Sequence, residues 1–133
     1  MLNNVHQPIK VAIIGTGHVG ASCAYALQLR GLASEIVLIN SSRQRAEGEA
    51  MDINHGSIFT KPVRVWAGEY RDCRDADIVV LAAGTSQRPG DTRLDLLKNN
   101  ATILQRMLAP ALRYLENAIV IVAANPAGTG QAG

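Results

Sequence analysis

Residues 9–40 read IKVAIIGTGHVGASCAYALQLRGLASEIVLIN: an apolar run, a glycine-rich turn, a stretch of helix-forming residues and a second apolar run. The turn contains Gly15, Gly17 and Gly20 in the spacing G-x-G-x-x-G. The first glycine permits a tight turn, the second lets the backbone approach a pyrophosphate, and the third lets the helix pack on the strand. The stretch therefore predicts a strand, turn and helix that bind a dinucleotide at the helix N-terminus.

The sequence on both sides favours this interpretation over a chance glycine turn. Residues 9–14 are almost wholly apolar, as in a parallel strand that helices cover on both faces. Residues 21–29 are rich in helix formers, and Gly31 stands where a left-handed C-cap is expected.

Strands and helices continue to alternate along the rest of the chain. A second helix is expected over residues 43–55, and four further strands are expected at 35–39, 63–68, 77–84 and 118–124. Such alternation is typical of right-handed β-α-β units. The sequence therefore predicts an α/β fold of the Rossmann type, a doubly wound parallel sheet of about five strands, one short of a complete fold.

A long third helix is expected to begin near Asp91 or Thr92. Apolar residues at helical spacing should form one face buried against the sheet: Leu97, Ala101, Leu104 and Leu108. Pro110 is expected to kink or break this helix, and residues 108–116 to continue as a second helical piece.

Composition limits the classes of partner. The 133 residues carry 13 Lys and Arg against 11 acidic residues, without a basic block, which argues against a nucleic acid or an anionic membrane as partner. No apolar run approaches the length of a membrane span. Cys23 and Cys73 have no C-x-x-C spacing, which indicates reduced thiols and a cytoplasmic location. We expect a polar leader at 1–8, a dinucleotide-binding domain at 9–126 and a flexible tail at 127–133.

The choice between NAD and NADP depends on the end of the second strand. A carboxylate usually stands there, about twenty residues after the last glycine, and binds the ribose hydroxyls of NAD. This chain has Asn40, followed by Ser41, Ser42, Arg43 and Arg45. The hydroxyl and guanidinium groups suit phosphate oxygens and favour NADP. Alternatively, both arginines are solvated residues that open the next helix, and Asn40 only weakens NAD binding. The residues leave both alternatives open.

Longer segments carry a family resemblance over about residues 9–126. The matching segments are 14–22 (IGTGHVGAS), 46–56 (AEGEAMDINHG), 83–97 (AGTSQRPGDTRLDLL) and 123–126 (AANP). The chain resembles the N-terminal, cofactor-binding half of L-lactate dehydrogenases, in the lactate/malate dehydrogenase family. The segment at 83–97 is far more specific than the glycine turn.

The resemblance implies roles in substrate binding. The loop after the fourth strand would close over the substrate and exclude water. Arg93 would polarise the substrate carbonyl and act in catalysis, Gln87 would suit the methyl side of pyruvate rather than a second carboxylate, and Asn125 would also reach the substrate. Seen alone, Arg93 is an ordinary solvated residue at a helix start and Gln87 an ordinary loop residue. Their joint spacing behind a dinucleotide motif favours the functional interpretation.

The same resemblance implies which residues line the cofactor groove besides the glycines and the residues after the second strand. They are Val19, Tyr70, Ala83, Gly84, Ala123 and Asn125. Tyr70 alone is equally explained as a packing aromatic with its hydroxyl in water.

The resemblance also implies what this chain does not supply. The family's catalytic histidine, the aspartate that orients it and the arginine that clamps the substrate carboxylate lie beyond residue 133. Because hydride transfer to a ketone needs a proton donor, we expect the chain to bind cofactor without turnover. It is then a truncated portion of a dehydrogenase for a small 2-oxo or 2-hydroxy acid, with exposed apolar surface that leads to homo-oligomers or self-association. The alternative is a stand-alone or engineered dinucleotide-binding scaffold module, with an intact polar surface.

Overall fold

The computed structural model describes residues 9–15, 17–55, 63–83 and 89–124. The elements, in chain order, are β1 (Lys10–Ile14), α1 (His18–Arg30), β2 (Glu35–Ile39), α2 (Arg43–His55), β3 (Arg64–Ala67), the short 3-10 helix η2 (Tyr70–Cys73), β4 (Ile78–Ala83), α3 (Arg93–Leu112) and β5 (Ile119–Ala124). All five strands lie within a residue of the predicted runs, and α2 has the predicted bounds. The expected leader and tail lie outside the described residues, so the domain boundaries stay predictions.

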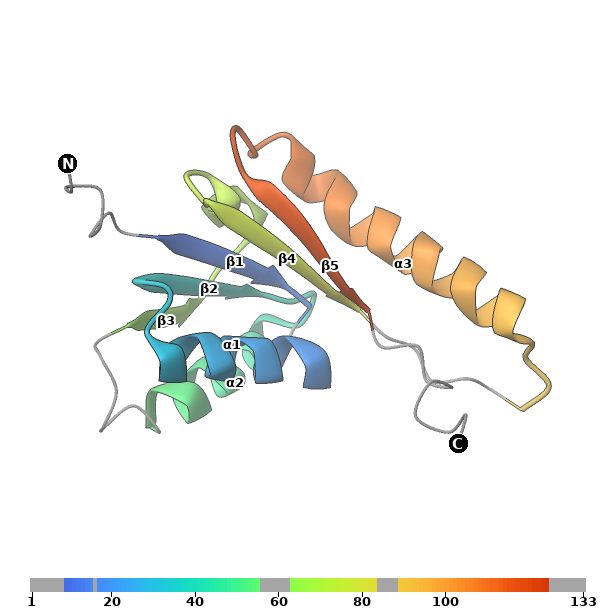
Figure 1. Cartoon of the computed structure of the whole chain (residues 1–133), viewed down its shortest axis with the longest axis horizontal. Helices are drawn as coiled ribbons and strands as arrows, with labels where there is room; N and C mark the ends of the chain where they lie inside the picture. Colours follow the sequence, from blue (N-terminus) through green and yellow to red (C-terminus); the bar gives the residue numbers. More distant parts are fainter. Residues whose placement is uncertain (1–8, 16, 56–62, 84–88, 125–133) are drawn as a thin grey trace.

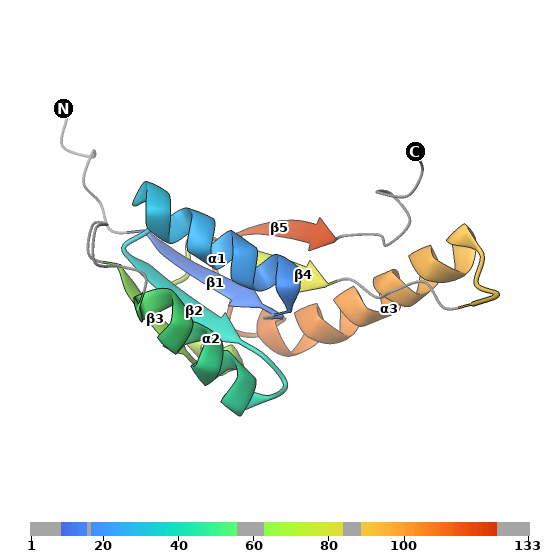
Figure 2. The same ribbon diagram turned by 90° about the horizontal axis from the view of Figure 1, so that it is seen from below.

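The five strands form one parallel sheet in the order β3-β2-β1-β4-β5. Helices α1 and α2 cover one face and α3 covers the other (Figures 1 and 2). This arrangement confirms the Rossmann-type fold, because the chain reverses its direction of growth between β3 and β4, on opposite sides of β1.

Alternate residues of the central strands pack on opposite faces. Ile13 and Leu38 belong to the core under α1 and α2, whereas Ile14 and Ile39 belong to the core under α3. All four side chains are at most 1% exposed. The strands therefore read as continuous apolar runs because both faces are covered.

Local signals define the ends of the first two helices. Gly31 ends α1 with φ 62° and ψ 31°, which confirms the predicted left-handed C-cap. Helix α2 begins after Ser42, whose Oγ accepts a hydrogen bond from the backbone N–H of Arg45 at 3.2 Å.

Helix α3 begins as predicted but packs differently. Thr92 is its N-cap, and its Oγ1 accepts from the N–H of Asp95 while Asp95 Oδ2 accepts from the N–H of Thr92, both at 3.0 Å. The prediction of a wholly buried face was wrong in the first half, where Leu97 is 54% exposed and Ala101 is also exposed. Only the second half packs on the sheet, because the first half projects beyond the carboxyl ends of the strands (Figures 1 and 2).

The prediction of a break at Pro110 was also wrong. Helix α3 runs through Pro110 and ends at Leu112, without a second helical piece over residues 113–116. Ala111 is 0% exposed and packs in the α3-side core, which holds the last turn in place. Because Pro110 is the third-last residue of the helix, the hydrogen bond it lacks falls where helices already begin to fray.

Strand β5 lies at one edge of the sheet and is poorly covered. The exposed fractions of its side chains are 64% for Ile119, 40% for Val120, 46% for Ile121 and 53% for Val122. Within the described part of the chain, no helix is long and apolar enough to cross a membrane.

Candidate functional site

The glycine turn after β1 is held by close backbone contacts. Gly15 has φ 91°, and its N–H donates to the carbonyl of Ile39 at 2.7 Å. A Cβ at Gly15 would collide with the carbonyl oxygen of Ala82, and a Cβ at Gly20 would collide with the carbonyl oxygen of Gly15. These contacts agree with the roles of a tight turn and of close helix packing.

Gly17, in contrast, faces open space. A Cβ there would meet no heavy atom within 4 Å. Gly17 is the N-cap of α1, with no side-chain cap and no acidic residue in the first turn. The first N–H groups of a helix lack intrahelical partners and favour an anion. Val19, predicted to line the groove, is half-buried and packs against the core under α1 and α2, so its role in the groove stays a prediction.

A hollow of about 620 Å³ lies on the α3 side of the sheet. Residues that follow β2 and β3 line one part of it, and residues at the end of α3 line another. The lining residues are Ile39, Asn40, Ser41, Arg43, Gly68, Glu69, Tyr70, Arg71, Pro110, Arg113 and Tyr114. Three of the predicted cofactor residues, Asn40, Arg43 and Tyr70, therefore meet in one hollow.

Asn40 organises the turn between β2 and α2. Its Oδ1 accepts hydrogen bonds from the backbone N–H of Ser42 and from Oγ of Ser41, both at 3.2 Å. This Asx-type turn fixes the chain where it leaves the sheet and leads directly into the N-cap of α2. The amide thus positions the first turn of α2 beside the hollow.

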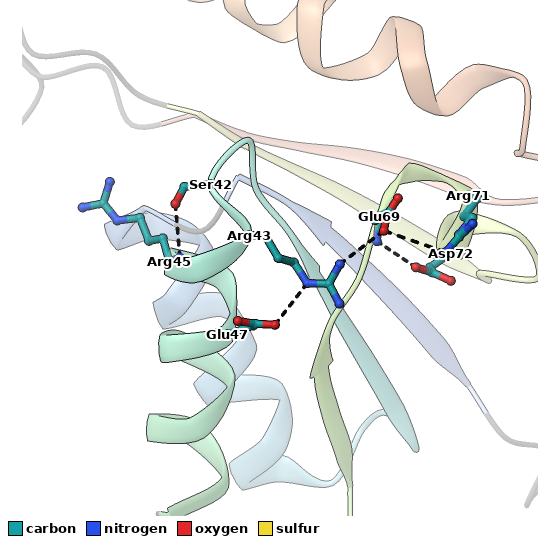
Figure 3. Close-up of polar contacts among 7 residues, drawn as sticks. All are labelled: Ser42, Arg43, Arg45, Glu47, Glu69, Arg71 and Asp72. Atoms are coloured by element: carbon teal, nitrogen blue, oxygen red, sulfur yellow. Dashed lines mark hydrogen bonds and ion pairs between the residues drawn. The ribbon is translucent and has the colours of Figure 1, made fainter.

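The two arginines predicted near Asn40 differ in position (Figure 3). Arg43 lies between two carboxylates, with Nε 3.5 Å from Oε2 of Glu47 and NH1 3.3 Å from Oε2 of Glu69. The Arg45 guanidinium points away from this group in Figure 3, and Arg45 does not line the hollow in the described part of the chain. Of the two, only Arg43 is placed to face a ligand there.

Tyr70 is half-buried in the wall of the hollow. Burial raises the pKa of its phenol, and the neighbouring Cys73 adds to this effect. The hydroxyl therefore stays protonated at neutral pH and can donate a hydrogen bond to a ligand.

The remaining predicted residues are not brought into the hollow. Ala83 and Ala124 pair at the ends of β4 and β5, and Ala123 packs against the core under α1 and α2. Arg93 is exposed at the first position of α3, a 20-residue helix whose length separates it from the hollow by roughly 30 Å. Gly84, Gln87 and Asn125 lie outside the described residues.

Sequence reasoning missed several residues of the hollow: Gly68, Glu69, Arg71, Pro110, Arg113 and Tyr114. Gly68 and Glu69 could have been found, because they follow β3, next to the predicted β2 end where parallel sheets bind ligands. Pro110, Arg113 and Tyr114 lie at or just after the end of α3, so their position depends on how that helix crosses the sheet, which no local pattern specifies. The described residues contain no cluster of His, Cys, Asp or Glu that could hold a metal ion.

The comparisons with known proteins agree with this geometry. The family model of the lactate/malate dehydrogenase NAD binding domain matches residues 9–131. The chain belongs to the lactate/malate dehydrogenase family. It is therefore an NAD-binding domain of that family, in agreement with the glycine turn and the fold.

Individual relatives of this family are similar over most of the chain. The probable L-lactate dehydrogenase of Schizosaccharomyces pombe is 48% identical over 120 residues, 90% of this chain and 36% of the relative. The L-lactate dehydrogenase of Geobacillus sp. is 49% identical over 118 residues, 88% of this chain and 37% of the relative. The crystal structure of the minor L-lactate dehydrogenase of Enterococcus mundtii has a TM-score of 0.82 and 45% identity, and covers 89% of this chain and 38% of that one. The chain thus spans little more than a third of the length of these curated relatives.

Proposed function

We propose that the chain binds the pyrophosphate of NAD at the N-terminus of α1 and its adenosine ribose beside Asn40, at the end of β2. The observation that carries this proposal is the open space at Gly17, because Gly15 and Gly20 are tightly packed while a Cβ at Gly17 would meet no atom within 4 Å. The hydrogen bond from Gly15 to Ile39 ties this turn to the end of β2, so both parts of the site belong to one rigid unit.

We further propose that the domain serves a dehydrogenase that transfers hydride between the nicotinamide and a small 2-oxo or 2-hydroxy acid, with pyruvate and lactate as the pair. The names of the similar proteins support this substrate. Arg93 would stabilise the charge on the substrate oxygen, and Gln87 and Asn125 would contact the substrate. Ala83, Gly84 and Ala123 would contribute to the cofactor groove. The exposure of Arg93 at the first position of α3 is compatible with a role in a segment that closes over the substrate.

Calorimetric titration of the purified chain with NADH and with NADPH tests the cofactor site. Saturable binding of NADH is expected, because the helix N-terminus at Gly17 is open to a pyrophosphate. Asn40→Asp should shift the preference further toward NADH, since a carboxylate repels a 2′-phosphate. If neither cofactor binds, the proposed site is wrong. An unchanged ratio of NADPH to NADH affinity in Asn40→Asp would show that Asn40 does not determine the choice between the two cofactors.

The uncovered β5 edge favours a dehydrogenase portion over a stand-alone scaffold module. A self-sufficient module should present a polar surface, whereas Ile119, Val120, Ile121 and Val122 are all at least 40% exposed. We propose that this surface leads to self-association, and that the protein is cytoplasmic, with both thiols free. A strictly monomeric chain in light scattering at high concentration would favour the scaffold module instead.

A further inference from the structure

A carboxylate stands next to Asn40 although the end of β2 lacks one. Strands β2 and β3 are paired up to Leu38 and Ala67. Continuing this register by two residues places Glu69 level with Asn40, and both residues line the same hollow. The charge that is absent from the end of β2 is therefore present just after the end of the neighbouring strand β3.

The backbone at Glu69 is firmly held. The N–H of Gly68 donates to the carbonyl of Leu38 at 2.9 Å, and the N–H of Glu69 donates to Oδ2 of Asp72 at 2.7 Å. A Cβ at Gly68 would come within 2.6 Å of Val37 Cγ2 and 2.7 Å of Asp72 Oδ2. Because position 68 has no side chain, Asp72 can approach and fix the backbone from which the Glu69 carboxylate extends.

The Glu69 carboxylate is shared by two of the arginines that line the hollow (Figure 3). Its Oε2 lies 3.3 Å from NH1 of Arg43 and 3.8 Å from NH2 of Arg71. Guanidinium groups are the side chains best suited to a 2′-phosphate. Glu69 therefore occupies donors that NADP would need, and adds a negative charge close to the ribose position.

We propose that Glu69 is the residue that makes this chain select NAD over NADP, in place of the acidic residue missing at Asn40. This inference rests on the proposed cofactor site beside Asn40. A ribose 2′-hydroxyl can donate to a carboxylate, whereas a 2′-phosphate is repelled by it and has to displace it from Arg43. Asn40 and Arg43 alone would accept NADP, and the Glu69 carboxylate that follows β3 reverses that preference.

Glu69→Gln is the first test, measured as the ratio of NADPH to NADH affinity in calorimetric titrations of the full chain. Removing one repulsive charge in a water-exposed site should raise this ratio about fivefold. Glu69→Asp keeps the charge and should leave the ratio near that of the unmodified chain. Thermal melting of both variants checks that the fold is retained.

Glu47→Gln is the matched control. Glu47 also pairs with Arg43, at 3.5 Å, but from within α2 and without lining the hollow. If the position of the carboxylate matters, Glu47→Gln should change the ratio less than about twofold. Equal effects of the two glutamine variants would show that only the release of Arg43 matters and would overturn a direct role for Glu69.

Arg43→Gln in the Glu69→Gln background tests how the gain arises. The increase in the ratio of NADPH to NADH affinity should fall by more than half if Arg43, released from Glu69, binds the 2′-phosphate. An unchanged ratio in Glu69→Gln, with both cofactors still bound, would overturn the inference while leaving the cofactor site intact. Absence of binding of both cofactors to the unmodified chain would overturn the site and the inference together.

Discussion

The sheet is more completely enclosed at strands β1 and β2 than at the edge strand β5. Strands β1 and β2 are covered by helices on both faces, and Ile13 and Leu38 are both 0% exposed. At the other side, β5 pairs with β4 alone among the described strands, and Ile121 is 46% exposed. Three of the predicted cofactor residues, Asn40, Arg43 and Tyr70, line the hollow beside β2, so the proposed nucleotide site lies in the half of the sheet that the chain itself encloses.

The largest expected effect on the free energy of unfolding comes from truncating a buried isoleucine, compared with truncating an exposed one. Ile13→Ala should lower the free energy of unfolding by about 3–4 kcal/mol, because a fully buried side chain loses its contacts and leaves a cavity. Ile121→Ala should cost about 1 kcal/mol, since nearly half of that side chain already faces solvent. Urea denaturation measures both. Equal losses would show that β5 is as well enclosed as β1 and would break the comparison.

A second pair of substitutions separates structure from binding within the glycine turn. Gly20→Ala should lower the free energy of unfolding by about 2–3 kcal/mol, because its Cβ meets the carbonyl oxygen of Gly15 and the backbone must shift. Gly17→Ala should leave stability within about 0.5 kcal/mol, because no atom lies within 4 Å of its Cβ, but should weaken NADH binding. The two readouts are thermal melting and calorimetry. Strong destabilisation by Gly17→Ala would contradict the open turn.

Much of this arrangement could be predicted because it depends on local patterns. The strands were predicted from apolar runs between turns, and the bounds of α2 and the αL cap at Gly31 from residues close in sequence. The exposure of Leu97 could not be predicted, since the apolar spacing of α3 continues past the carboxyl ends of the strands, where the sheet no longer covers the helix. The helix through Pro110 could not be predicted either, because burial of Ala111 is a tertiary contact.

The candidate site was predictable to a similar degree. Asn40 and Tyr70 were predicted for the cofactor site, and both line the hollow. The ion pair of Arg43 with Glu69 joins residues 26 positions apart, and only the register of β2 with β3 brings them together. Polar partners across strands require that register, which a single sequence does not contain.

The buried thiol of Cys73 should make the free energy of unfolding depend on pH more strongly than a less buried thiol does. Burial raises the pKa of the Cys73 thiol from 9.0 to about 11. The charge of Lys10 lowers this pKa and that of Asp72 raises it, both by less than burial does. Because the folded-state pKa of the thiol exceeds its unfolded-state value, the unfolded chain loses the thiol proton at a lower pH than the folded chain. The contribution of the protonated thiol to the free energy of unfolding is therefore complete below about pH 9 and is lost as the pH rises toward 11. Between these values the chain should lose about 2 kcal/mol more than the Cys73→Ala variant.

Urea denaturation at pH 8 and pH 11 measures this difference. Tyrosine and lysine side chains also titrate in this range, so the comparison with Cys73→Ala isolates the thiol. Cys23→Ala is the matched control, since that thiol is only half-buried, and it should change the pH dependence less. Parallel curves for the unmodified chain and Cys73→Ala would mean that water reaches Cys73.

A substitution at the β5 edge should have a small effect on stability and a clear effect on association. Ile121→Thr keeps the β-branched shape that suits a strand, so the free energy of unfolding should change by less than about 1 kcal/mol. The same change removes apolar surface from an edge strand, where unpaired backbone groups and exposed Val120 and Val122 can contact a second copy. Light scattering at increasing concentration should show a rising mass for the unmodified chain and a smaller rise for the variant. A matched Leu29→Gln variant, at a residue that is 50% exposed on α1, should leave the rise unchanged. If both variants reduce association equally, contact between copies is spread over the surface, and β5 is no more adhesive than the helices that enclose the other half.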